Sequence, residues 1–174
     1  MFEAFKSFEQ ITDKDFINTP EEFMAKYEGK TFLSGLYRIH KREDVNKWNG
    51  IIAEAFSISS DSIQVFGYDW AGRNFAVYKE TGTVIICEPG TGEAFDTGKD
   101  FEQFHDEEIP QNHAVCLMSE YFQEWKETNP ADIAHNECVG YKVPLFLNGK
   151  DEVANLEISD MEVYWEIMIP LIKL

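Results

Sequence analysis

Several residues of the kinds that bind metal ions lie close together between residues 105 and 116. The run His105-Asp106-Glu107-Glu108 is followed by His113 and Cys116, and histidine, cysteine and carboxylate side chains are the usual ligands of zinc. His113 and Cys116, however, adjoin the apolar stripe of a helix predicted over residues 112–127, and the acidic run is typical of a solvated helix end. We therefore predict no metal ion and no cofactor here.

No catalytic constellation emerges from the remaining polar residues. The glycines Gly92 and Gly98, with Lys99, resemble a phosphate-binding loop, but the spacing is one residue too long and Asp100 replaces the required Ser or Thr. No Ser or Cys occupies a nucleophile elbow, and the carboxylates are too numerous for one acid–base pair to stand out. His40, beside two basic residues, is expected at the surface. The sequence thus predicts a protein without enzymatic activity.

The most distinctive central segment is the turn over residues 67–73, which places Tyr68, Asp69, Trp70 and Arg73 at one end of a hairpin. Aromatic residues with an arginine are typical anchors of protein–protein interfaces, so these four residues are candidates for partner binding. The alternative is structural, because Asp69 can bond its own turn and Trp70 can fill the edge of a core. The sequence leaves both interpretations open.

Composition bounds the class of protein. A chain of 174 residues with 44% hydrophobic and 14% aromatic residues predicts one folded domain rather than a disordered segment. No apolar run is long enough to span a membrane, and the N-terminus lacks the pattern of a signal peptide. Cys87, Cys116 and Cys138 each have apolar neighbours, which predicts reduced cysteines in the core of a cytoplasmic protein.

Net charge is −17 and is unevenly distributed along the chain. Residues 1–92 carry 14 acidic and 10 basic residues, whereas residues 93–174 carry 18 acidic and 5 basic residues. Direct binding of nucleic acid is not expected, because phosphate contacts need clustered Lys and Arg. A basic protein partner and simple solubility both remain explanations. The acidic residues we expect to be exposed for such a partner are Asp106, Glu107, Glu108, Glu120, Glu124 and Glu127.

Hydrophobic periodicity and turn residues predict an α+β fold in which helices flank an antiparallel β-meander. Helices are expected over residues 20–28, 43–56, 100–107 and 112–127, the last with Ala114 on its buried side. Residues 2–9 are expected to form a short amphipathic helix or an ordered arm. Strands are expected over residues 36–39, 62–66, 74–78, 83–87 and 94–95. Short connections make the meander strands antiparallel.

The C-terminal segment predicts a strand, a polar turn and a buried helix. Residues 143–147 are an apolar run of strand length, and residues 148–151 have strong turn chemistry. Ser159 and Glu162 have the spacing of a capping box before an apolar helix, which we expect to be packed on most sides and to kink or end at Pro170. We treat residues 1–174 as one domain, with an N-terminal arm (1–29), a helix-and-meander core (30–128) and a C-terminal strand-turn-helix (129–174).

Three stretches carry a resemblance to a known family: residues 66–76, residues 88–93, and residues 138–147 together with 161–165. They resemble bacterial immunity proteins against DNase effectors of type VI secretion, a family that often carries a GAD-like region. The order of elements is also similar to that of the wider SUKH (Smi/Knr-like) superfamily. The resemblance covers roughly residues 30–168.

The resemblance implies a SUKH-like fold and a cytoplasmic protein that inhibits one cognate toxin stoichiometrically, without catalysis. The implied toxin is a nuclease with a basic surface, for which the acidic half of the chain is a suitable partner. Two alternatives remain: a regulatory scaffold that binds several host proteins, as some SUKH relatives do, and a protein that binds a small ligand in a pocket.

Overall fold

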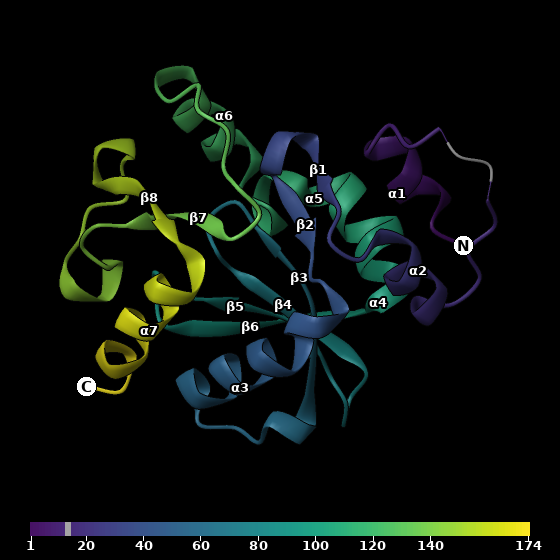
Figure 1. Cartoon of the computed structure of the whole chain (residues 1–174), viewed down its shortest axis with the longest axis horizontal. Coiled ribbons are helices and arrows are strands. Elements are labelled where there is room, and N and C mark those ends of the chain that lie inside the picture. Colours follow the sequence, from purple (N-terminus) through teal and green to yellow (C-terminus); the bar gives the residue numbers. More distant parts are fainter. Residues whose placement is uncertain (13–14) are drawn as a thin grey trace.

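A six-stranded antiparallel sheet forms the centre of the protein (Figure 1). The structure, a computed structural model, describes residues 1–12 and 15–174; residues 13 and 14, part of the expected N-terminal arm, lie outside the described residues. Each strand pairs with the next one along the chain, so the sheet is a meander, as predicted. Its strands are β1 (Thr31–Phe32), β2 (Tyr37–Ile39), β3 (Ile63–Asp69), β4 (Asn74–Tyr78), β5 (Thr83–Glu88) and β6 (Glu93–Asp100).

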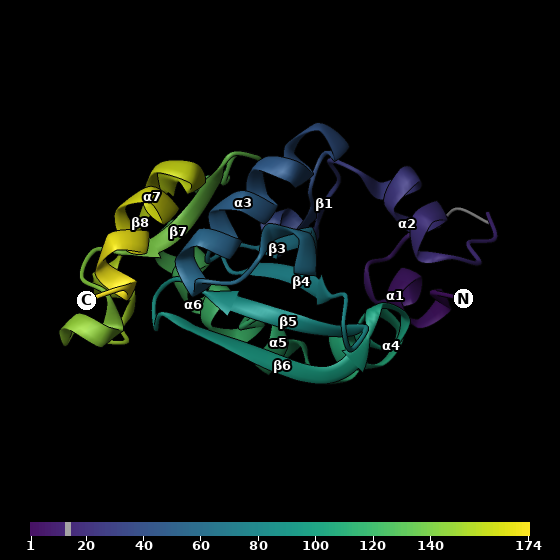
Figure 2. The ribbon, with the colours of Figure 1, turned by 90° about the horizontal axis from the view of Figure 1, so that it is seen from below.

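Helices cover both faces of this sheet and bury one core on each face. The helices are α1 (Glu3–Phe8), α2 (Pro20–Tyr27), α3 (Val45–Phe56), α4 (Phe101–Gln103), α5 (Ile109–Cys116), α6 (Ser119–Thr128) and α7 (Met161–Ile172). One core joins α3 and α7 to the sheet, and the other joins α1, α2, α4, α5 and α6 to its opposite face. Figure 2 shows α3 lying along the sheet, with the two termini at opposite ends of the molecule. The α+β fold is thereby confirmed.

Local signals in the sequence place several elements correctly. Helix α2 begins as predicted, because the Thr19 side chain accepts a hydrogen bond from the Glu22 amide and Pro20 occupies the first turn. Strand β4 has the predicted bounds, whereas β6 extends well beyond the two expected residues. All three cysteines are buried free thiols, as expected.

The C-terminal strand pairing differs from the prediction. Residues 143–147 form a loop and a short 3-10 turn rather than a strand, and the pair is instead β7 (Glu137–Tyr141) with β8 (Leu156–Asp160). Pro144 has no amide to donate to a ladder, and the Leu145 amide instead donates to the Gly90 carbonyl at 3.0 Å. The apolar run is therefore used to join the loop to the β5–β6 turn.

Helix α7 begins one residue later than the expected capping box requires. The Asp160 carboxylate accepts hydrogen bonds from the Glu162 and Val163 amides, both at 3.1 Å, while Ser159 pairs with Cys138 in the β7–β8 ladder. An aspartate at this position also interacts favourably with the helix dipole. Pro170 lies within the last turns of the helix, which continues to Ile172.

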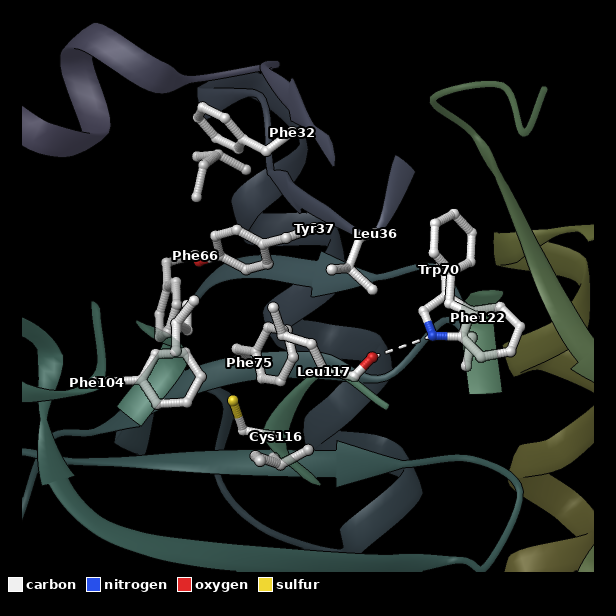
Figure 3. Packing of buried hydrophobic residues seen from close by; sticks show 14 of the residues in the cluster. Phe32, Leu36, Tyr37, Phe66, Trp70, Phe75, Phe104, Cys116, Leu117 and Phe122 are labelled. Atoms are coloured by element: carbon white, nitrogen blue, oxygen red, sulfur yellow. Dashed lines mark hydrogen bonds between the residues drawn. The ribbon is translucent and has the colours of Figure 1, made fainter. Parts of the chain in front are cut away.

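The helix expected over residues 112–127 is divided into α5 and α6. Met118 adopts a left-handed conformation with φ of 48°, and Ala114 is exposed rather than buried. The break occurs where the Trp70 indole Nε1 donates to the Leu117 carbonyl at 3.1 Å (Figure 3). A contact between residues 47 positions apart thus decides where these helices separate.

Two histidines are buried, although the charged residues next to them in the sequence indicate exposed positions. His40, expected at the surface, is 2% exposed and its Nε2 lies 2.8 Å from the Asn74 Oδ1. His105 is fully buried; its Nδ1 donates to the Phe101 carbonyl at 2.7 Å, so its Nε2 accepts from the Tyr37 hydroxyl at 2.9 Å. Burial lowers the pKa of His40 to about 4 and that of His105 to about 3, so both are neutral.

Candidate partner-binding surface

The turn after β3 lies in the interior. Tyr68, Asp69, Trp70 and Arg73 are all at most 6% exposed. The Tyr68 hydroxyl donates to the His135 carbonyl, and the Arg38 guanidinium lies 5.6 Å from the centre of the Tyr68 ring. These side chains contact other parts of the same chain. This arrangement is the one that the structural interpretation of the turn expects.

A buried ion cluster explains why Asp69 and Arg73 are held inside. The Arg73 Nε donates to the Asp69 Oδ2 at 2.6 Å and lies 3.5 Å from the Glu88 Oε2, while its Nη2 donates to the Cys116 carbonyl at 2.9 Å. Asp69 also accepts from the Ala71 and Arg73 amides, both at 3.0 Å. One cation therefore compensates two carboxylates and ties α5 to the sheet.

Burial affects the two carboxylates of this cluster in the same direction. It raises the pKa of Glu88 to about 7 and raises the pKa of Asp69 above its ordinary value, although the Arg73 charge opposes both shifts. The Arg73 charge therefore offsets part of the free-energy cost of burying negative charge on Asp69 and Glu88.

Trp70 connects the meander to the C-terminal segment. Its backbone amide donates to the Leu36 carbonyl at 3.2 Å, and its own carbonyl accepts from the Val139 amide at 2.8 Å. Figure 3 shows its side chain among buried residues, with Phe122 beside it. The turn is thus a junction between β2, β7 and the α5–α6 break.

The six acidic residues expected at the surface do not form one group. The Asp106 carboxylate accepts from the Phe2, Ala4 and Phe5 amides at 2.9–3.1 Å and so holds the start of α1. Glu107 pairs with Lys99 at 2.8 Å, and Glu108 accepts from the Asn112 side chain at 3.1 Å. These three half-buried carboxylates are already engaged within the chain.

The other three acids remain available on α6. Glu120, Glu124 and Glu127 are exposed, whereas Phe122 and Trp125 on the same helix are buried. We call these three acids the α6 acidic face. Figure 1 places α6 near the edge of the molecule, at the same end as β7, β8 and α7.

Close packing fixes α7 against the rest of the chain. A Cβ atom added at Gly140 in β7 would lie 2.4 Å from the Cε2 of Tyr164, so only glycine permits this contact. The Trp165 indole donates to the Gly72 carbonyl at 2.8 Å, which connects α7 to the turn between β3 and β4. Both contacts hold α7 in place through side chains on its buried side.

The opposite side of α7 is uncovered, contrary to the expectation that the helix is packed on most sides. Val163 is 49% exposed and Ile167 is 56% exposed. The β7–β8 sheet and α3 cover only part of the circumference of α7. The apolar residues on the rest of the circumference are therefore exposed to solvent. Sequence reasoning missed this face because it judged the helix by its narrow polar stripe rather than by how many elements were available to cover it.

The structure also has a groove of about 970 Å³ at the other end of the sheet. The residues that line it include the apolar Phe66, Val77 and Phe101 and the acidic Glu21 and Glu102. Among the described residues, no group of three or more His, Cys, Asp or Glu is arranged to hold a metal ion. No helix in the described ranges is long and apolar enough to cross a lipid bilayer.

Comparison with known proteins finds a family that the C-terminal part of the chain resembles. Residues 98–171 match the family model described as T6SS immunity protein Tdi1, C-terminal, where T6SS denotes the type VI secretion system. The matched segment runs from the end of β6 through most of α7 and includes the α6 acidic face. Among curated proteins, none matched the sequence.

A solved structure has a similar fold over nearly the whole chain. The crystal structure of Atu4351 from Agrobacterium tumefaciens superposes with a TM-score of 0.63 and 13% sequence identity, covering 97% of this chain and 88% of that one. At this identity the similarity establishes the fold alone. Residues 98–171 are therefore similar to the C-terminal region of a type VI secretion immunity family, and the whole chain has an α+β fold similar to that of Atu4351.

Proposed function

We propose that this chain is a cytoplasmic, non-enzymatic immunity protein that binds one cognate toxin of type VI secretion and neutralises it as a stoichiometric complex. The observation that carries the proposal is the family match over residues 98–171. Inhibition of this kind requires a complementary surface and no chemical step by the inhibitor itself. The toxin is a nuclease effector, as the sequence resemblance implies.

The charge of the chain supports a basic toxin. Nucleases bind phosphate through Lys and Arg, and the C-terminal half of this chain carries 18 acidic residues against 5 basic ones. The α6 acidic face is the part of that charge whose three carboxylates are exposed on one helix. We assign it the role of accelerating encounter with the toxin, because complementary charge mainly affects the association rate.

Co-expression tests the proposal directly. The effector is captured from the native lysate with the tagged chain and identified by mass spectrometry. It is then expressed in a bacterial host with and without the chain, and growth is followed while the two proteins are purified together. We expect the chain to restore growth and to co-purify with the effector. Continued killing, with both proteins folded and separately recovered, would contradict the proposal.

The groove favours a second candidate, a protein that binds a small ligand. Its volume of about 970 Å³ is within the size range of ligand pockets. A thermal-shift screen with nucleotides, amino acids and sugars distinguishes the candidates, since a ligand that binds the folded state raises the melting temperature. A scaffold, in contrast, is expected to co-purify with several host proteins.

A further inference from the structure

The exposed side of α7 has an apolar stripe that no other element covers. Val163 and Ile167 are spaced four apart, so they occupy neighbouring positions on one face of the helix. Pro170 is exposed on the following turn, whereas Leu171 is half-buried and packs against the core. We call Val163, Ile167 and Pro170 the α7 outer face.

The remaining sides of α7 are already engaged. Met161, Trp165 and Met168 are at most 3% exposed in the core below the helix. Toward α3, Glu162 pairs with Lys47 at 2.7 Å and Lys173 pairs with Glu54 at 3.5 Å. The α7 outer face is therefore the one stripe of this helix without a partner among the described residues, and exposed apolar patches on folded proteins mark interaction sites.

Charge around the stripe determines what kind of partner fits. Glu166 is exposed on the same helix, directly before Ile167. A second copy of the chain would bring like charges together, because the molecule has a net charge of −17. A partner with apolar side chains flanked by Lys or Arg is complementary in both respects.

We propose that the α7 outer face is the docking site for the cognate toxin, which contributes an apolar segment flanked by basic residues. The inference rests on the proposed function and adds the surface that holds the complex together. The α6 acidic face then governs the association rate, and the α7 outer face governs dissociation, because buried apolar anchors supply most of the binding energy of an interface.

The test compares two charge-introducing double variants of the full chain. Val163→Asp/Ile167→Asp alters the α7 outer face, and Phe95→Asp/Val115→Asp alters exposed apolar residues of β6 and α5 in the same way. The probe is the effector captured with the chain from its native lysate, purified as a catalytically inactive variant, and binding is measured by biolayer interferometry. We expect the α7 variant to bind about 100-fold more weakly, mainly through faster dissociation, and the control variant to bind within about threefold of wild type.

The outcomes separate this inference from the proposed function. If the wild-type chain does not bind the effector, the proposed function fails. If it binds and the α7 variant binds equally well, the docking site is elsewhere and the inference is overturned. A wild-type dimer that becomes monomeric in the α7 variant, seen by light scattering, would also overturn it. Circular dichroism checks each fold, and the milder Ile167→Ser replaces the α7 double variant if that variant unfolds.

Discussion

Glu9, immediately after α1, is a buried carboxyl whose environment favours its neutral form. The residue is 7% exposed, and neither carboxyl oxygen has a hydrogen-bond partner within the described part of the chain. Burial raises the pKa of Glu9 from 4.5 to about 8. The folded protein therefore binds more protons than the unfolded chain between these pH values, and its stability falls as pH rises across that range.

The size of this effect follows from the two pKa values. At 1.36 kcal/mol per pKa unit, the difference costs about 5 kcal/mol when fully developed above pH 8 and about 3 kcal/mol at pH 7. Glu9→Gln removes the ionisation while keeping the shape of the side chain. We expect the variant to be more stable than wild type by about 3 kcal/mol at pH 7 and nearly equal to it at pH 4.5.

Urea unfolding at pH 4.5, 6, 7 and 8 measures the difference. The matched control is Glu3→Gln at the first residue of α1, whose side chain is 70% exposed and pairs with Lys6. We expect the control to differ from wild type by less than about 0.5 kcal/mol at every pH. A stability difference for Glu9→Gln that stays constant with pH would refute the assignment of a buried, neutral carboxyl.

Three further predictions concern the ion cluster, the packing of α7 and the α6 acidic face. Arg73→Leu leaves two buried carboxylates without their cation, so urea unfolding should show a loss of about 3–5 kcal/mol, part of it recovered on adding Asp69→Asn. Gly140→Ala should lower the melting temperature by forcing a contact of 2.4 Å with Tyr164, whereas Gly50→Ala in α3, with nothing within 4 Å, should raise it. Replacing the α6 acidic face by lysine should slow association with the effector about tenfold at low salt, with little effect at high salt; an unchanged salt dependence would exclude steering by these residues.

Signals contained within a few residues predicted this fold best. The Thr19–Pro20 start of α2 and the bounds of β4 depend on capping, periodicity and turn chemistry, all of which are local. The antiparallel meander followed from the short connections between its strands. These features needed no knowledge of what each element packs against.

Features that depend on distant contacts were not predictable in the same way. Trp70 fixes the break after Leu117 from another part of the chain, and the burial of Arg73 depends on Glu88 in a different strand. The turn over residues 67–73 has the composition of an interface because aromatic and charged residues also build a buried junction. The exposed face of α7 required knowing how many elements surround the helix.

Titration of effector activity with the purified chain tests the central claim most directly. DNA cleavage by the effector captured with the chain from its native lysate is measured while the chain is added in increasing molar ratio. Stoichiometric inhibition predicts that cleavage falls linearly and stops when the two proteins are equimolar. Cleavage that persists at a large molar excess of folded chain would contradict the account.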